Sequence, residues 1–178
     1  MGSSDGRLSR QEIVELLRRL GELAEQRGIR IDLFLVGGAA MALAYNSQRT
    51  TADLDAVFEP KQLVYELARI VATESEPELG EGWLNDGVKA FLPGPDAEAY
   101  GVLADLPGIS VTVASPKYLF VLKALAARES DEDDLRRLYG LCGFSNADEA
   151  LDAVAAAYPT VRIRPSVEFL VRGIAELS

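Results

Sequence analysis

The 178-residue sequence predicts a mixed α/β (α+β) fold: a sheet of about four to five strands flanked by helices, followed by a C-terminal helical region. Two observations predict this class. Apolar segments with helical and strand periodicity alternate up to residue 114, whereas the segments after it are all helical. In addition, 48% of the residues are hydrophobic, which is enough for a sizeable core. We predict a core with an N-terminal helix over residues 1–114 and a helical region over 115–178, packed together as one compact unit.

The first helix has a clear start and stop. Ser9 and Glu12 form a capping box, in which each side chain can accept a hydrogen bond from the other residue's backbone N–H. Apolar residues then recur at helical spacing, and Gly28 ends the helix. The apolar run at 31–36 predicts a buried strand that enters a tight turn at Gly37-Gly38.

The following elements are predicted in the same way. Small apolar residues at 39–45 predict a short helix packed closely on the first strand, and the period-two pattern of 53–58 predicts a second strand. Pro60 opens a helix that runs to about Thr73. Later segments predict strands at 88–92 and 109–114, and helices at 116–128, at 131–139, from about 145, and at 165–177.

Composition excludes several classes of site. The chain has no histidine, so it holds no Ser-His-Asp triad and no His-ligated metal. Its one cysteine, Cys142, excludes an internal disulfide framework and a Cys-rich zinc site. A metal must therefore be held by oxygen ligands, which favours Mg²⁺, Mn²⁺ or Ca²⁺.

Charge and hydropathy bear on partners and location. The net charge of −10 argues against nonspecific coating of nucleic acid. The longest charge-free stretch, 33–48, has 16 residues and is too short and polar to span a bilayer. We expect no signal peptide, no membrane association and a cytoplasmic location, and the sequence sets no oligomeric state.

Asp53 and Asp55 are the first candidate site residues. Residues i and i+2 of a strand point to the same face, so both carboxylates project together while Leu54 turns towards the core. Two like charges about 4 Å apart repel by roughly 4 kcal/mol at an effective dielectric of 20. Such a pair is stable when it is solvated or bridged by a cation such as Mg²⁺. The alternative is an exposed edge strand whose polar face carries two acids.

Phosphate-binding candidates flank this pair. Gly37 and Gly38, between a strand and a helix, allow backbone N–H groups to approach a phosphate. Arg49 is suited to a bidentate phosphate contact, and Thr50 offers a neighbouring hydroxyl. Each has a structural alternative: the glycines fit a tight turn, and the arginine pairs with a surface acid.

A second group lies in the C-terminal region. Lys123 is the one charged residue in the apolar helix segment 118–127, where it either extends to solvent or serves a function such as binding a triphosphate. Asp131 and Asp134 follow at i, i+3 spacing. Their alternative role is to stabilise the N-terminus of the next helix.

These motifs resemble the signature of the DNA-polymerase-β-like nucleotidyltransferase superfamily. The resemblance is carried by Phe34-Leu-Val-Gly-Gly-Ala-Ala-Met-Ala-Leu-Ala-Tyr45 and by Arg49-Thr-Thr-Ala-Asp-Leu-Asp-Ala-Val-Phe58. Lys123 with Asp131-x-x-Asp134-Leu resembles the closing motif of the AbiEii/MenT-type branch, nucleotidyltransferase toxins of toxin–antitoxin pairs, and of related bacterial proteins.

The resemblance implies a set of roles. Gly37, Gly38, Arg49 and Thr50 would contact the NTP, with Lys123 on its triphosphate. Asp53 and Asp55 would bind Mg²⁺ or Mn²⁺, and Asp131 or Asp134 would position the lysine or the acceptor. The reaction would be attack of an acceptor hydroxyl on the α-phosphate, with release of pyrophosphate. The leading interpretation is a toxin that modifies tRNA 3′ ends or another RNA and has a protein antitoxin.

Departures from the pattern keep other functions open. Ala39 stands where many members have serine, and neither predicted strand, 88–92 or 109–114, carries the third carboxylate that is frequent in the superfamily. These departures favour a noncatalytic module that binds a nucleotide or a partner. Eight acids between residues 74 and 105 would suit a cationic small-molecule acceptor, whereas RNA would need the arginines around the first helix.

Overall fold

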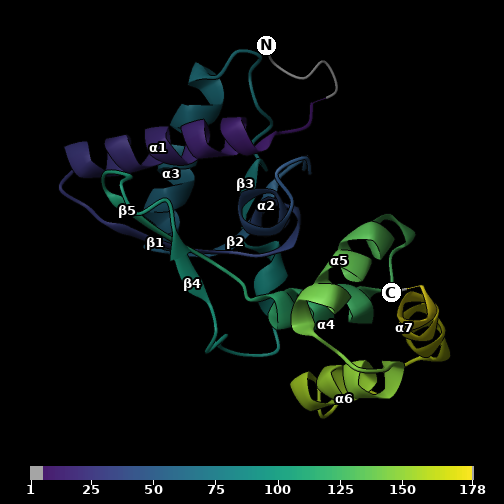
Figure 1. Cartoon of the computed structure of the whole chain (residues 1–178). Helices are drawn as coiled ribbons and strands as arrows, with labels where there is room; N and C mark the ends of the chain where they lie inside the picture. The colour runs from purple at the N-terminus through teal and green to yellow at the C-terminus, as the bar shows by residue number, and fades with distance from the viewer. Residues whose placement is uncertain (1–5, 178) are drawn as a thin grey trace. The chain divides into compact units, whose positions relative to one another are not determined.

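The computed structural model describes residues 6–177 and divides the chain into two compact units (Figure 1). The first unit comprises the chain up to Ala90 together with Ala99–Ala114. The second comprises Phe91–Glu98 and the chain from Ser115 onward. The sheet belongs to the first unit, and the second is built of helices.

Five strands among the described residues form a mixed sheet with the order β3-β2-β1-β5-β4. Strand β1 runs antiparallel to β2 and parallel to β5, while β2 is parallel to β3 and β4 is antiparallel to β5. The predicted α/β fold class, with four to five strands, is confirmed. The strands are β1 (Ile31–Leu35), β2 (Leu54–Glu59), β3 (Leu84–Asn85), β4 (Tyr100–Val102) and β5 (Ile109–Val113).

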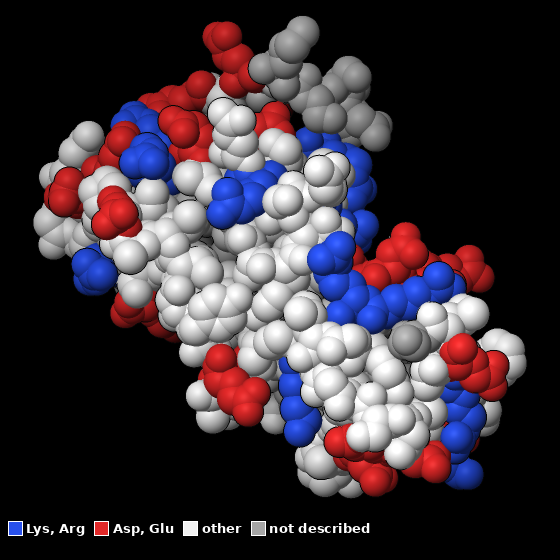
Figure 2. Space-filling view, in the orientation of Figure 1, with Lys and Arg blue, Asp and Glu red and all other residues white. Residues whose placement is uncertain are grey.

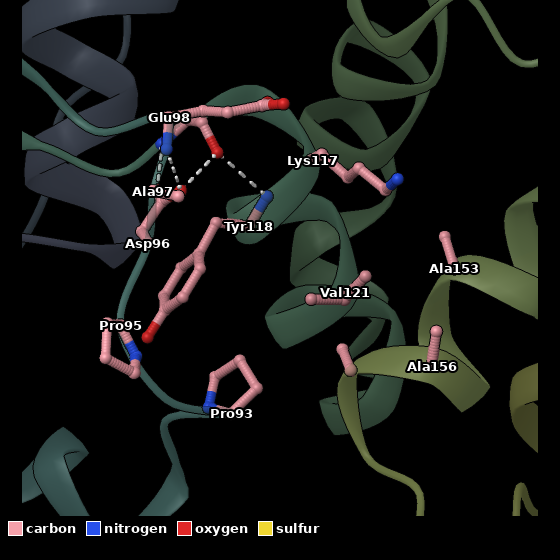
Figure 3. A pocket seen from close by; sticks show the side chains of 12 residues that line it. Pro93, Pro95, Asp96, Ala97, Glu98, Lys117, Tyr118, Val121, Ala153 and Ala156 are labelled. Atoms are coloured by element: carbon pink, nitrogen blue, oxygen red, sulfur yellow. Dashed lines mark hydrogen bonds between the residues drawn. The ribbon is translucent and has the colours of Figure 1, made fainter.

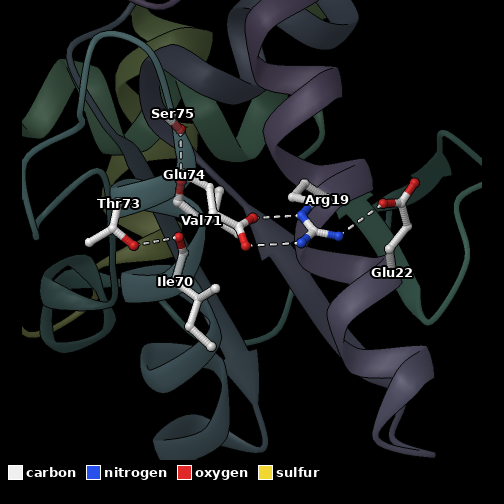
Figure 4. Close-up of polar contacts among 7 residues, drawn as sticks. All are labelled: Arg19, Glu22, Ile70, Val71, Thr73, Glu74 and Ser75. Carbon is white, nitrogen blue, oxygen red and sulfur yellow. Dashed lines mark hydrogen bonds and ion pairs between the residues drawn. The ribbon is translucent and has the colours of Figure 1, made fainter.

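Two helices cover one face of this sheet. Helix α1 (Arg10–Gln26) packs against β5, α3 (Lys61–Glu74) packs against β2, and the two helices contact each other (Figure 1). The capping box at Ser9 and Glu12 is present as predicted. Arg19 of α1 donates two hydrogen bonds to Glu74 at the end of α3, at 2.7 and 3.0 Å (Figure 4). This ion pair joins the helices at the solvent-facing side of their apolar contact.

The apolar alternation of the strands fits this arrangement. Ile31, Leu33 and Leu35 of β1 are buried, whereas the alternate residue Asp32 is exposed and Phe34 is half-buried. Helix α2 (Gly37–Ala40) follows β1 directly and continues as a π-helix, η1 (Met41–Tyr45). The predicted helix at 39–45 is therefore present, but it begins two residues earlier and includes both glycines.

The prediction of a strand at 88–92 is wrong. Gly87–Phe91 forms a 3₁₀ helix, η2, because two local hydrogen bonds close a turn there. The Asn85 Oδ1 accepts from the Gly87 N–H at 3.1 Å, and the Asp86 carbonyl accepts from the Lys89 N–H at 3.0 Å. The extended residues of this region are instead the short strands β3 and β4, which the apolar pattern did not predict.

The second unit confirms the predicted helical C-terminal region. Phe120 lies fully buried at its centre and packs against the rings of Tyr139 and Phe144, with ring centroids 6.2 and 5.0 Å away. No helix in the described part of the chain has the length and apolar character needed to cross a membrane. The helices are α4 (Pro116–Ala126), the short 3₁₀ helix η3 (Glu129–Asp131), α5 (Glu132–Cys142), α6 (Ala147–Ala157) and α7 (Pro165–Glu176).

Candidate active site

One edge of the sheet gathers the glycine turn and the paired aspartates. Because β1 and β2 are antiparallel, the end of β1 lies beside the start of β2. Gly37 follows β1 and Asp53 precedes β2, so both residues lie at this edge. Strand β3 runs parallel to β2 and pairs Asn85 with Asp55. Residues that are far apart in the sequence thus meet at this edge.

The glycine turn lies in close contact with the second strand. Gly37 has φ +61°, a conformation that favours glycine, and a Cβ there would lie 3.1 Å from Asp55 Oδ2. A Cβ on Gly38 would lie 2.5 Å from Thr51 Oγ1. Both positions therefore require glycine, because only a missing side chain lets the turn approach the carboxylate and the threonine.

The second strand begins one residue later than the period-two pattern predicts, so Asp55 lies on β2 and Asp53 lies just before it. Leu54 is fully buried, while Asp53 and Asp55 on either side of it are half-buried. The side chain of Asn85 donates a long hydrogen bond to Asp53, 3.5 Å from Nδ2 to Oδ2. Two carboxylates and one amide thus lie together, and the carboxylate oxygens are ligands of the kind that Mg²⁺ prefers.

The loop before β2 is held by the residues that precede α1. Leu8 and Thr51 exchange two backbone hydrogen bonds, of 2.6 and 3.0 Å. Arg7 donates to the Thr50 hydroxyl at 2.9 Å and to its carbonyl at 2.7 Å, so the predicted phosphate ligand Thr50 has a structural contact. Arg49, the other predicted phosphate ligand of this loop, is half-buried.

The donor set fits a divalent cation held by few protein ligands. Among residues 6–177 there is no cluster of three or more acidic or cysteine side chains arranged to hold a metal. Magnesium commonly takes one or two carboxylates and completes its shell with water and substrate phosphates. Asp53 and Asp55 supply two such carboxylates, and Gly37 packs directly against Asp55.

The remaining predicted site residues form a buried cluster in the second unit. Lys123 of α4 is 7% exposed, so it does not extend to solvent. Its Nζ lies 2.5 Å from Asp131 Oδ1 and 3.1 Å from Asp134 Oδ2. Both aspartates are buried as well, at 7% and 3% exposure. The structure therefore brings Lys123, Asp131 and Asp134 together, as an ion triad between α4 and α5.

The second unit also contains an open pocket of about 350 Å³, which is lined mainly by small apolar side chains of the 93–97 segment, α4 and α6 (Figure 3). The N-terminus of α4 at its rim is already capped from within the chain. Asp96 accepts hydrogen bonds from the Ser115 N–H at 2.7 Å and from its hydroxyl at 3.0 Å. Tyr118 lies along the wall and donates to the Gly94 carbonyl. Because Asp96 already supplies the negative group, this helix end does not point to a phosphate site.

Comparison with known proteins identifies the family. Residues 11–141 match the model of a family described as "Nucleotidyltransferase of unknown function (DUF6036)". The chain belongs to this family. Membership supports the nucleotidyltransferase part of the resemblance, and the AbiEii/MenT-type assignment stays a prediction.

A search of curated proteins finds no match to the chain. Among solved structures, the chain is similar to the crystal structure of an antigenic nucleotidyltransferase-like protein from Paracoccidioides brasiliensis. The two are 17% identical over 93% of this chain and 94% of the other, with a TM-score of 0.47.

Sequence reasoning missed Asn85 at this edge. It noted Thr51 as one of the hydroxyls before the carboxylate strand and Arg7 as one of the arginines beside the first helix, but not their contacts. Arg7 and Thr51 act through backbone contacts that leave no pattern in the sequence. Asn85 lies on a two-residue strand, too short to show a period of two. The Lys61 ammonium and the Tyr65 hydroxyl, which both bond to Asp86, hold the pKa of this carboxyl below its ordinary value.

Proposed function

We propose that the chain transfers a nucleoside monophosphate from an NTP to an acceptor hydroxyl in the presence of Mg²⁺, or of Mn²⁺ in its place. The observation that carries the proposal is the contact between the glycine turn and the carboxylate strand. Gly37 lies against Asp55, and Asn85 lies next to both half-buried aspartates, because it pairs with Asp55 in the ladder and donates to Asp53. Membership in a nucleotidyltransferase family supports the same reaction class.

Each group at the sheet edge has a role in this reaction. Asp53 and Asp55 would hold the cation, which when bound neutralises phosphate charge and polarises the phosphoryl oxygens. The turn at Gly37-Gly38, which follows β1 and opens α2, would offer its backbone N–H groups to the phosphates. Lys123 on the triphosphate, with Asp131 or Asp134 to position it, is the role that the resemblance implies for the second cluster.

The transfer balances without a redox partner. The acceptor oxygen forms a bond to the α-phosphorus, and the bond between that phosphorus and the bridging oxygen breaks, so pyrophosphate leaves. The hydroxyl releases one proton. Since the chain has no histidine, the proton acceptors that this site offers are the oxygens of Asp53 and Asp55.

The test is transfer of label from each of the four NTPs, with Mg²⁺, to three acceptor pools: total RNA, lysate protein and polycationic small molecules. We expect Asp55→Asn to lower transfer by about 100-fold or more, because it removes one charge from the metal site. Asp105→Asn, an exposed acid of the same unit, is the matched control and should keep wild-type transfer. Equal transfer by wild type and Asp55→Asn would refute the proposal.

A noncatalytic nucleotide-binding role is the second candidate. It is favoured by Asn85, a neutral side chain beside the two aspartates, and by the lack of a three-acid cluster in the described residues. Calorimetry distinguishes the two candidates. Tight NTP binding that depends on Asp55, without turnover on any acceptor pool, would support the binding role and contradict the transferase.

The resemblance extends the proposal to the cell: a toxin that modifies tRNA 3′ ends and is neutralised by a protein antitoxin. Expression of the chain alone should then arrest growth, and Asp55→Asn should relieve the arrest. Label in the tRNA fraction would identify the acceptor as RNA. Growth unaffected by the wild-type chain, with label in the cationic small-molecule pool, would replace the toxin role with a small-molecule transferase.

A further inference from the structure

Strand β3 is only two residues long, yet it is fixed firmly against β2. Leu84 is fully buried, and Trp83 before it is 3% exposed. The Trp83 indole N–H donates to the Ala68 carbonyl of α3 at 2.9 Å, and the Leu54 N–H donates to the Trp83 carbonyl at 2.7 Å. These contacts hold Asn85 beside Asp55 in the ladder.

The residue after Asn85 fixes the other end of the strand. Asp86 accepts from the Tyr65 hydroxyl at 2.6 Å and pairs with the Lys61 ammonium at 2.5 Å. Both partners belong to α3, and the Tyr65 ring packs edge-on against Phe58 of β2 at 5.2 Å between centroids. Asn85 is thus held from both sides, by a buried Trp-Leu pair before it and by an ion pair after it.

The local hydrogen bonds also orient the amide of Asn85. Its Oδ1 accepts from the Gly87 N–H at 3.1 Å, which turns Nδ2 towards Asp53 Oδ2 at 3.5 Å. This contact restrains Asp53 Oδ2, and it thereby also fixes the direction in which the other oxygen of the Asp53 carboxylate points. Groups that orient metal ligands in this way typically affect metal affinity by about 10–100-fold.

The charge of Asn85 matters as much as its position. Two aspartates give this edge a charge of −2, and a neutral third side chain adds nothing to it. A second divalent cation beside the first would then face Coulomb repulsion that a carboxylate at position 85 would offset and that the amide does not. Phosphates of a bound NTP would supply the missing negative charge.

We propose that Asn85 is a positioning residue for Asp53, and that its neutral amide limits the Asp53–Asp55 pair to one divalent cation until a nucleotide binds. This inference rests on the proposed function, because it assumes that the aspartates hold a metal.

The test measures Mn²⁺ binding to the full chain without nucleotide, by the loss of the free-ion electron paramagnetic resonance signal. We expect wild type to bind one Mn²⁺, and Asn85→Ala to bind it about 10–100-fold more weakly while the melting temperature stays close to that of wild type. Asn85→Asp should bind a second ion. Tyr65→Phe, which removes a bond to Asp86, should weaken binding less than Asn85→Ala does.

Activity provides an independent readout. Raised Mg²⁺ should restore transfer by Asn85→Ala, since a weakened site is saturated by mass action, whereas a folding defect is not rescued in this way. Mn²⁺ binding by Asn85→Ala equal to wild type, with loss in Asp53→Asn, would overturn the positioning role and leave the proposed function standing. Binding that depends on Asn85, without transfer to any acceptor, would support the positioning role and overturn the transferase. A single ion bound by Asn85→Asp would refute the charge limit.

Discussion

At the residue scale, the requirement for glycine at position 38 is the most direct consequence of the geometry. A methyl group there would lie 2.5 Å from Thr51 Oγ1 and 3.0 Å from Thr51 Cβ, so Thr51 would have to move. Thr51 is buried and its hydroxyl donates to the Asp53 carbonyl at 3.0 Å. Displacing Thr51 therefore disturbs the backbone of the carboxylate segment itself.

We predict that Gly38→Ala lowers the free energy of unfolding by about 1–3 kcal/mol, the usual cost of overpacking. The matched control is Gly140→Ala, in helix α5, where a new Cβ meets no atom within 4 Å. It should stabilise the chain by about 0.5–1 kcal/mol, as alanine does within a helix. Urea unfolding measures both changes. A Gly38→Ala protein as stable as wild type would show that Thr51 yields freely.

At the same scale, the sequence predicted what depends on local spacing. The burial of Leu54 between the half-buried Asp53 and Asp55 follows the period of two, although Asp53 lies just before β2. The contact of Asn85 with Asp53 spans 32 positions and depends on a strand pairing that no local pattern encodes. The third polar side chain at this edge therefore lies on β3, outside the two segments, 88–92 and 109–114, that the apolar pattern predicts as strands.

At the element scale, the Lys123 triad joins two helices. One ammonium between two carboxylates leaves a net charge of −1 in a place where all three residues are at most 7% exposed. Removal of one member of a buried ion pair leaves an uncompensated charge, which commonly costs about 3–5 kcal/mol. Even if Lys123 contacts a triphosphate, it also has a structural task.

We predict that Lys123→Met lowers the free energy of unfolding by about 3–5 kcal/mol, because it leaves Asp131 and Asp134 buried without their cation. A triple variant that adds Asp131→Asn and Asp134→Asn should regain most of the loss, since no charge then remains. Chemical denaturation of both variants measures the effect. If the single variant were as stable as wild type, the triad would contribute nothing to the packing of α4 on α5.

Helices were easier to predict than strands because their start and stop signals lie within or next to the helix itself. The boundaries of α1 and α7 follow from caps and from prolines that lie within the helix sequence itself. Strands β3 and β4 have two and three residues, and they exist because neighbouring strands offer them hydrogen bonds. Their positions therefore depend on the assembled sheet and not on their own residues.

At the scale of the whole molecule, several acidic and basic groups pair with each other locally. Over α1, Figure 2 shows acidic and basic side chains intermixed. Arg19 pairs with Glu74, and Arg27 pairs with Glu66 at 3.5 Å. Arg19 and Arg27 are therefore already paired with acids, and an arginine surface that docks RNA would have to be formed by other arginines. The net charge of −10 is thus borne by acids elsewhere, and it makes the folded chain increasingly self-repelling as further groups lose protons.

We expect a pronounced loss of stability at alkaline pH. One reason is the growing repulsion between negative charges, and the second is the burial of two tyrosines. Burial raises the pKa of Tyr118 and of Tyr158 from 10.0 to about 12. Their hydroxyls donate to the carbonyls of Gly94 and Phe91, at 2.6 and 2.8 Å, and so tie the 91–98 segment to α4 and to the end of α6. A phenolate cannot donate either bond.

The sign follows from the raised pKa values. Below about pH 10 both tyrosines are protonated in the folded and the unfolded chain, so their contribution to stability is complete. Between pH 10 and 12 the unfolded chain loses these protons first, so the free energy of unfolding falls as the pH rises. The melting temperature of wild type should therefore decline steeply in this window.

The double variant Tyr118→Phe, Tyr158→Phe tests this. Its free energy of unfolding at neutral pH should be lower than that of wild type by about 1 kcal/mol for each lost hydrogen bond, and its melting temperature should decline less steeply with pH. Identical slopes for the two proteins, measured by thermal melts together with phenolate absorbance, would show that these hydroxyls do not hold the segment in place.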